Sequence, residues 1–243
     1  MLFKELREDI AAYMERDPAA KGPAEIILCY PGFHALLFHK MSRWLWTHNF
    51  HLAGRFLSHV AKVLTGVEIH PGAEIGRRFV IDHGTGVVIG ETAVIGDDVT
   101  LYHDVTLGGV APSVDSAAQV GQKRHPTLED GVIVGSGAQI LGPINVGGHA
   151  RVGANSVVTK DVPSSVTAVG VPAKAVMPRD REKAREFQAY GTPSDGCPDP
   201  VLQTIEALRQ QVTALGMRVE ELEAEVEQTD RQPKSNAPRK KVG

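Results

Sequence analysis

The sequence is poor in several residue types that define particular classes of protein. It contains only two cysteines among 243 residues, which is too few for a disulfide framework or a thiolate metal site. No apolar run approaches the roughly eighteen residues of a membrane-spanning helix, and the charged first residues lack the apolar core of a signal peptide. We therefore expect a cytoplasmic protein without membrane contact.

Neither sign of charge is in large excess. Lys and Arg number 26 against 29 Asp and Glu, which gives a net charge of -3. The one dense basic cluster, Arg239-Lys240-Lys241, lies at the end of the chain and is interpreted as a solvated tail. Nucleic acid is therefore not an expected partner.

What the sequence does contain is an aliphatic repeat with a period of six over residues 69–158. Neither a helix nor an alternating strand has this period, whereas hexapeptide repeats are typical of parallel β-helices, in which each short strand buries one aliphatic side chain. The alternative, a β-sandwich, spaces its strands irregularly. The repeat positions are Ile69, Ile75, Ile81, Val87, Ile89, Ile95, Leu101 and Leu107, followed by Leu128, Val134, Ile140, Val146, Val152 and Val158.

The repeat is interrupted twice, and polar side chains gather at both interruptions. A slip of two residues follows Asp82-His83-Gly84, and a longer break over 108–126 ends in Arg124-His125-Pro126. Long loops in a compact domain are usually functional. His83 is a candidate general base, because imidazole titrates near neutral pH and a neighbouring carboxylate can fix its tautomer. A purely structural histidine is the alternative.

The residues before the repeat, 1–66, predict a small helical domain. One helix ends at Arg16, and the next is expected to begin at Asp17-Pro18 with the carboxylate of Asp17 as its cap. Two further helices follow, one opened by Pro31 and one closed by Gly66. Their predicted buried stripes are Phe33, Leu36, Leu37, Trp44 and Leu45 in the first, and Leu52, Phe56, Leu57, Val60 and Leu64 in the second.

The residues after the repeat divide into three segments. The repeat domain, 67–178, ends in a Pro-rich closing strand and cap, and a short polar helix and linker follow at 179–200. Apolar residues at heptad spacing then predict a coiled coil at 201–228, and a polar tail at 229–243 should be disordered. The fold class is mainly β with α: helices, a parallel β-helix, then a coiled-coil helix.

Motifs along residues 17–174 resemble the serine O-acetyltransferase family of hexapeptide-repeat enzymes. The resemblance implies a left-handed parallel β-helix, a homotrimer or a hexamer made of two trimers, and active sites between neighbouring coils. It also implies acetyl transfer from acetyl-CoA to L-serine in cysteine biosynthesis. The motifs that carry it are Asp17-Pro18-Ala19, Gly32-Phe33-His34-Ala35, Trp44-Leu45-Trp46, Ile69-His70-Pro71, Asp82-His83, Thr85-Gly86, Val88-Ile89-Gly90-Glu91-Thr92, Thr106-Leu107-Gly108-Gly109, Arg124-His125-Pro126 and Gly170-Val171-Pro172-Ala173.

The resemblance also implies roles for individual side chains. His83 matches the base that takes the proton from the serine hydroxyl during direct attack on the thioester, and Glu68 stands where the family usually has the Asp that orients this base. Asp17 and Asp82 match the groups around the serine amino group. Arg124 matches the arginine that binds the serine carboxylate, for which a guanidinium fork is well suited, and His125 matches a second substrate histidine.

Acetyl-CoA is the expected co-substrate, and no metal is expected. A bound pantetheine arm needs small residues for close approach to the backbone, and a lysine can meet a CoA phosphate. The residues expected to contact the co-substrate are Gly108, Gly109, Ser136, Ala154 and Lys174.

Three other functions fit parts of the pattern. An acetyltransferase for another hydroxyl, such as homoserine or a sugar, would share His83. A zinc enzyme resembling γ-class carbonic anhydrases would need converging histidines, and a non-catalytic scaffold would need only the oligomer. The family also associates with O-acetylserine sulfhydrylase through a C-terminal isoleucine, and the sequence ends in Lys241-Val242-Gly243 instead, which argues against that partner.

Overall fold

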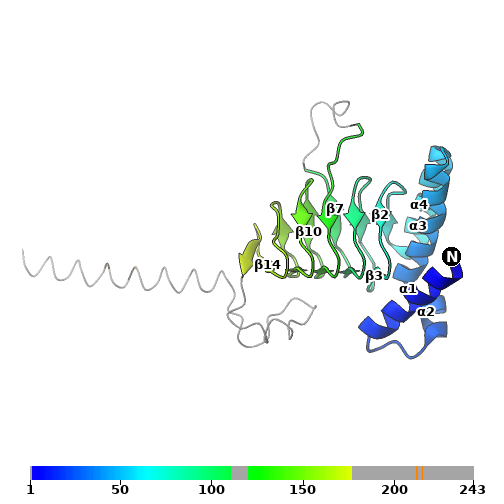
Figure 1. The fold of residues 1–243 in the computed structure, drawn as a ribbon, viewed down its shortest axis with the longest axis horizontal. Coiled ribbons are helices and arrows are strands. Elements are labelled where there is room, and N and C mark those ends of the chain that lie inside the picture. The colour runs from blue at the N-terminus through cyan, green and yellow to red at the C-terminus, as the bar shows by residue number, and fades with distance from the viewer. Residues whose placement is uncertain (1, 111–119, 177–211, 213–214, 216–243) are drawn as a thin grey trace, which may run out of the picture. The chain divides into compact units, whose positions relative to one another are not determined.

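The computed structural model describes residues 2–110 and 120–176, together with Val212 and Leu215 (Figure 1). The chain divides into two units, Met1–Cys197 and Pro198–Gly243. In the second unit the two described residues are helical and exposed. The predicted segments at 179–200 and 229–243, and the rest of the predicted coiled coil, lie outside the described residues.

Four helices precede the repeat: α1 (Leu2–Arg16), α2 (Pro23–Cys29), α3 (Pro31–Thr47) and α4 (His51–Thr65). The first ends at Arg16 as predicted, but no helix begins at Asp17. Instead the Asp17 carboxylate accepts the backbone N–H of Ala19 at 2.8 Å and closes a tight turn, because an Asp side chain readily bonds the backbone two residues on. The helix begins at Pro23, which takes the first helical position. Among the described residues, no helix has both the length and the apolar content needed to cross a membrane.

Helices α3 and α4 pack as a hairpin, and the buried face of α4 is not the predicted one. Its buried residues are small, namely Gly54, Ser58, Ala61 and Thr65. A Cβ on Gly54 would lie 2.8 Å from the Ser42 carbonyl of α3, so the helices approach too closely for large side chains. Most of the predicted stripe therefore faces outward: Leu52 is 85% exposed, and Phe56 and Leu64 are each 67% exposed. Leu57 and Val60 are half-buried. In α3, Phe33 and Leu36 are buried as predicted, whereas Trp44 is 57% exposed.

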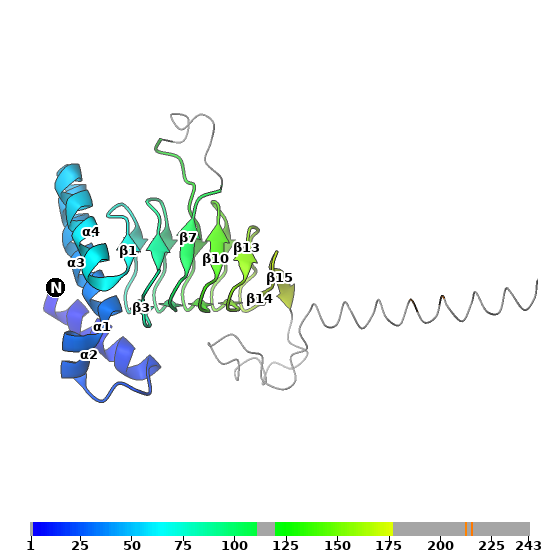
Figure 2. The ribbon, with the colours of Figure 1, turned by 180° about the vertical axis from the view of Figure 1, so that it is seen from behind.

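The repeat folds as three parallel sheets that share one core (Figures 1 and 2). One sheet has the order β1-β4-β7-β10-β13, the second β11-β8-β5-β2, and the third β15-β14-β12-β9-β6-β3. Each circuit of the chain adds one strand to each sheet, which is the topology of a parallel β-helix. The strands are β1 (Glu68–Ile69), β2 (Glu74–Ile75), β3 (Val80–Ile81), β4 (Val88–Ile89), β5 (Val94–Ile95), β6 (Thr100–Leu101), β7 (Thr106–Gly108), β8 (Thr127–Leu128), β9 (Ile133–Val134), β10 (Gln139–Leu141), β11 (Asn145–Val146), β12 (Arg151–Val152), β13 (Val157–Val158), β14 (Thr167–Val169) and β15 (Lys174–Val176).

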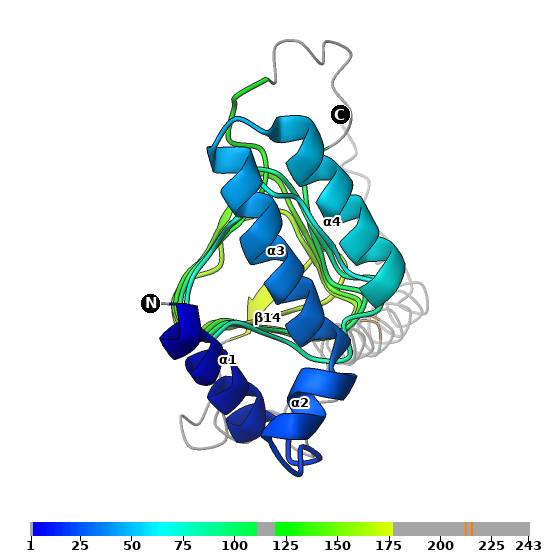
Figure 3. The ribbon, with the colours of Figure 1, turned by 90° about the vertical axis from the view of Figure 1, so that its right-hand side faces the viewer.

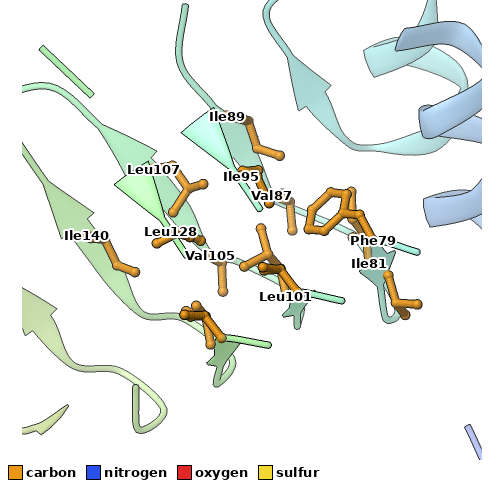
Figure 4. Packing of buried hydrophobic residues seen from close by; sticks show 14 of the residues in the cluster. Phe79, Ile81, Val87, Ile89, Ile95, Leu101, Val105, Leu107, Leu128 and Ile140 are labelled. Carbon is orange, nitrogen blue, oxygen red and sulfur yellow. The ribbon is translucent and has the colours of Figure 1, made fainter. Parts of the chain in front are cut away.

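The core confirms the period of six, because the repeat positions point inward. Ile89, Leu107 and Ile140 belong to three successive strands of one sheet and are at most 1% exposed. Residues of the other two sheets, such as Ile95 and Leu101, meet them in the interior (Figure 4). Burial of these aliphatic side chains, at about 25 cal/mol per Å² of apolar surface, holds the coil together.

Strand register shows where the two interruptions are placed. An uninterrupted circuit takes 18 residues, since Val88 pairs with Thr106. The circuit that contains His83 takes 20, since Glu68 pairs with Val88, so the slip adds two residues at the corner between β3 and β4. The longer break lies between β7 and β8, at a different corner of the triangle seen in Figure 3.

The helices cover the first circuit of the coil. Helices α3 and α4 contact β1, and α1 and α3 contact β3. A Cβ on Gly32 would lie 2.0 Å from the Ile81 carbonyl, so the start of α3 sits directly on β3. This close packing fixes the helical domain against the residue that precedes Asp82.

Candidate active site

His83 projects from the corner that contains the two-residue slip. Its backbone is left-handed, with φ of 61°, as is usual at the corners of this coil. Asp104, at the same corner of the next circuit, has φ of 58°, and Asp98 and His149, at another corner, have φ of 59° and 58°. The side chain is 58% exposed, and Nε2 lies 3.8 Å from Asp82 Oδ1. His103, from the next circuit, presents its ring edge at a centroid distance of 5.8 Å. The imidazole is thus open to solvent and flanked by a carboxylate and a second imidazole.

Asp82 is the more buried member of the pair, with 18% of its side chain exposed. Burial raises the pKa of its carboxyl, and the nearby carboxylate of Asp17 raises this pKa further, while His83 and His103 lower it. Asp17 comes from the turn after α1. The structure therefore brings Asp17, Asp82 and His83 together, although they are far apart in the sequence.

Tyr30 also contacts this group and was not predicted from the sequence. Its hydroxyl donates to Asp17 Oδ2 at 2.5 Å. Burial and the Asp17 carboxylate raise the pKa of the Tyr30 phenol, so the phenol remains a protonated donor at neutral pH. Sequence reasoning missed Tyr30 because the turn at 17–22 is what brings it opposite Asp17. For His103 a signal existed, since it lies 20 residues after His83, which is the length of that circuit.

Glu68 lies on the first strand of the coil, β1. Its Oε2 accepts from Lys62 Nζ at 2.5 Å, and Arg55, Ser58 and Lys62 of α4 line a shallow depression beside it. The carboxylate that the structure places against His83 is instead that of Asp82. The predicted contact of Glu68 with the base therefore stays a prediction.

Arg124 and His125 end the long loop and are held by the strand connection below it. Thr92 Oγ1 accepts the backbone N–H groups of both residues, at 3.0 and 3.1 Å. Arg124 Nη2 contacts Glu91 Oε2 at 2.6 Å. The backbone N–H of Thr92 donates to His125 Nδ1 at 3.1 Å, so the neutral ring carries its proton on Nε2.

His125 is 8% exposed. Burial and the adjacent Arg124 lower its pKa, so it is a neutral hydrogen-bond donor near pH 7. Its ring packs on Gly90, where a Cβ would lie 2.1 Å from Nε2. Gly90 is therefore part of the support for this histidine.

The residues predicted to bind the co-substrate lie in three places. Ser136 and Ala154 continue the corner that carries His83 and His103, because the Gly137 N–H donates to the His103 carbonyl and the Asn155 N–H to the Ser136 carbonyl. Gly108 ends β7 and Gly109 follows it, at the corner of Arg124. Lys174 is exposed at the start of β15.

The predicted site residues thus form two groups in one chain. Asp17, Asp82 and His83 lie at the corner between β3 and β4, and Arg124 and His125 at the corner between β7 and β8. The sheet that contains β4 and β7 separates the two corners. Within 2–110 and 120–176, no cluster of three or more His, Cys, Asp or Glu side chains could hold a metal ion.

Fold and site together define an acyltransferase of the hexapeptide-repeat class. Residues 1–37 match the family model described as serine acetyltransferase, N-terminal. The serine acetyltransferase of Mycobacterium tuberculosis is 54% identical over 171 residues, which cover 70% of this chain and 72% of that protein. That of Bacillus subtilis is 41% identical over 228 residues, which cover 94% of this chain and 100% of that protein. The chain belongs to the serine acetyltransferase family.

Solved structures agree with this assignment. The serine acetyltransferase of Neisseria gonorrhoeae in complex with serine is 41% identical, with a TM-score of 0.67 over 72% of this chain and 69% of that one. A serine acetyltransferase in complex with CoA is 40% identical, with a TM-score of 0.66 over 72% of this chain and 69% of that one. The predicted family, enzyme class and acetyl-CoA co-substrate are confirmed.

Proposed function

We propose that this chain catalyses acetyl transfer from acetyl-CoA to the hydroxyl of L-serine by direct attack, with His83 as the general base. The observation that supports this most is the solvent-open imidazole beside Asp82 and Asp17. His83 takes the hydroxyl proton as the serine oxygen attacks the thioester carbonyl. A tetrahedral intermediate forms, then the C–S bond breaks and the proton passes to the leaving CoA sulfur. No acyl-enzyme is formed.

Asp82 has two functions in this scheme. It lies beside Nε2 of His83 and stabilises the imidazolium that forms during attack. Together with Asp17 it also supplies negative charge for the ammonium group of serine. The carboxylate of Asp17 raises the pKa of Asp82, and the substrate ammonium relieves this repulsion.

The serine carboxylate is bound by Arg124 and His125 from a neighbouring copy of the chain. In one chain these residues lie at a different corner from His83, so a complete site requires that the two corners meet across an interface. A cyclic trimer has such a heterologous interface, because one surface of each copy faces a different surface of the next. The proposed assembly is a homotrimer of left-handed parallel β-helices. Glu68, at the position of the family's orienting carboxylate, is proposed to contact the base in that assembly.

Mixing two inactive variants tests the shared site. His83→Asn and Arg124→Ala chains are each expected to be nearly inactive. Trimers reassembled from an equal mixture should regain about one quarter of the wild-type activity, because about one site in four combines an intact His83 from one chain with an intact Arg124 from the next. Recovery of no activity from mixed oligomers would show that the site lies within one chain.

Acetyl-CoA is proposed to bind along the corner above His83. Ser136 and Ala154 continue this corner, and Gly108 and Gly109 of a neighbouring chain lie opposite them in the trimer. Small residues permit close approach of the pantetheine arm to the backbone, and Lys174 is available for a CoA phosphate. The proposed domain boundaries are 1–66 for the helices and 67–178 for the coil.

Two trimers are proposed to pair through the exposed apolar side chains of α3, α4 and the loop between them. Apolar residues scattered singly on a surface are common, but several of them on neighbouring helices indicate a protein interface. Sedimentation of the full chain against a truncation after Gly191 separates this contribution from that of the predicted coiled coil. The exposed side chains are Met41, Trp44, Phe50, Leu52, Phe56, Val63 and Leu64.

The catalytic assignment is tested by a pair of matched variants. His83 and His149 have similar backbone angles, with φ of 61° and 58°, and Asn tolerates this conformation. In an assay of CoA thiol release, His83→Asn should lower kcat about 10²- to 10⁴-fold, while His149→Asn, at another corner, should leave it unchanged. Serine, homoserine and a galactoside are compared as acceptors. Absence of turnover with serine by the wild-type chain would refute the proposed function.

A further inference from the structure

Tyr30 occupies the single residue between α2 and α3 and faces the turn that carries Asp17. Its hydroxyl donates to Asp17 Oδ2 at 2.5 Å, and the Ala19 N–H donates to Oδ1 at 2.8 Å. Each oxygen of the Asp17 carboxylate therefore accepts one hydrogen bond from a donor within the chain. Each oxygen retains a further lone-pair direction, so the carboxylate can still accept hydrogen bonds from a ligand.

The Tyr30 ring is itself held in place. It stands edge to face against Tyr13, with centroids 5.7 Å apart and planes at 83°. The Tyr13 hydroxyl donates to the Ile81 carbonyl at 3.3 Å and accepts the Ile81 N–H at 3.2 Å. Ile81 directly precedes Asp82. One chain of contacts thus connects the backbone beside Asp82 to the carboxylate of Asp17.

We infer that Tyr30 is a positioning residue that sets the orientation of Asp17 toward the amino group of the acceptor. This inference rests on the proposed role of Asp17 in serine binding. A hydroxyl bonded to one carboxylate oxygen restricts rotation of the Asp17 side chain, so the carboxylate keeps a single orientation toward an ammonium group. Tyr30 therefore contributes to selection of acceptors that carry a positive charge beside the hydroxyl.

A merely structural role for Tyr30, in holding the turn at 17–22 against α2, makes a different prediction. Loss of a structural contact would affect all acceptors alike, or would lower thermal stability without changing selectivity. A positioning role affects only acceptors with an amino group. The comparison of serine with 3-hydroxypropionate, which keeps the hydroxyl and carboxylate but lacks the amino group, separates the two.

The test uses Tyr30→Phe in the full chain, which removes only the hydroxyl. With saturating acetyl-CoA, the KM for serine should rise about five- to tenfold, as expected for one lost hydrogen bond to a charged group. The kcat should stay within about twofold, and the KM for acetyl-CoA should not change. The slower turnover of 3-hydroxypropionate should be the same for variant and wild type.

A double-mutant cycle completes the test. In an Asp17→Asn background, Tyr30→Phe should change the KM for serine less than about twofold, because its effect acts through the carboxylate. An unchanged KM for serine in the single variant, or equal losses with serine and 3-hydroxypropionate, overturns the inference while the proposed function stands. Absence of serine turnover by the wild-type chain overturns both.

Discussion

His39 is a buried histidine whose protonation should govern the acid stability of the helical domain. It is 5% exposed on α3, and neither ring nitrogen has a hydrogen-bonding partner among the described residues. The Ala73 carbonyl near it already accepts from Arg43 Nη1 at 2.8 Å. Burial, followed by the positive charge of Arg43, lowers the pKa of His39 from 6.5 to about 3.

The charges around His39 come from each element packed against it. A cavity of about 260 Å³ adjoins the ring, between α1, α3 and the first circuit of the coil. The charged side chains that line this cavity are Glu5, Glu8 and Asp9 from α1, Lys40 and Arg43 from α3, and Arg77 from the coil. His70 of the coil also lowers the pKa of His39.

The sign of the pH effect follows from the lowered pKa. Between about pH 3 and 6.5 the unfolded chain binds a proton at His39 that the folded chain does not, so the free energy of unfolding falls as the pH falls through this window. From pH 8 to pH 5 the loss from this one residue is about 2 kcal/mol. For a chain of this size that corresponds to a Tm lower by about 4–8 °C.

The variant His39→Leu removes the titrating group and keeps an apolar side chain of similar size. Its Tm relative to wild type should rise by about 4–8 °C between pH 8 and pH 5, as measured by calorimetry at both pH values. His59→Leu, on the exposed side of α4, serves as the control and should show no such change. Burial also lowers the pKa of His70, to about 4, but that residue is present in both chains and cancels. An equal difference in Tm at both pH values would refute a buried neutral His39.

Three further changes test the packing and the site. Gly32→Ala places a methyl group against the Ile81 carbonyl and should lower the free energy of unfolding by about 1–3 kcal/mol in urea titrations; unchanged stability would contradict the close contact of α3 with β3. Gly90→Ala should displace the His125 ring and lower kcat/KM for serine about 10²-fold, with far-UV circular dichroism unchanged; wild-type kinetics would show that this ring is not needed. Arg124→Lys keeps the charge but loses the fork and should raise the KM for serine about tenfold; equal KM values would exclude paired binding of the serine carboxylate.

The coil could be predicted from the sequence because its signal is local and regular. A buried aliphatic residue every six positions allows few alternatives, and Leu107 and Ile140 stack as expected although 33 residues separate them. The helical faces were harder to predict. In α4, large apolar residues predicted the buried stripe, but Gly54 and Ser58 allow α3 to approach so closely that the small face is buried instead.

Part of the candidate site could also be predicted, since His83 and Asp82 are adjacent in the sequence and lie at an interruption of the repeat. The contact of Asp17 with Tyr30 could not, because it depends on a turn that replaces the expected start of a helix. That Arg124 and His83 lie at different corners could not be predicted from the sequence either, because the corner that a residue occupies depends on the length of every circuit before it.

The two ends of the coil have consequences for self-association. An open parallel coil exposes a complete set of strand edges, onto which another copy can stack to form a fibre. Here the first circuit is covered by helices, and the third sheet finishes with β15, which runs antiparallel to β14 and so ends the parallel repeat. Removal of α1–α4 would expose the strand edges of the first circuit. The helical domain therefore blocks end-to-end polymerisation at this end of the coil, and it also positions Asp17.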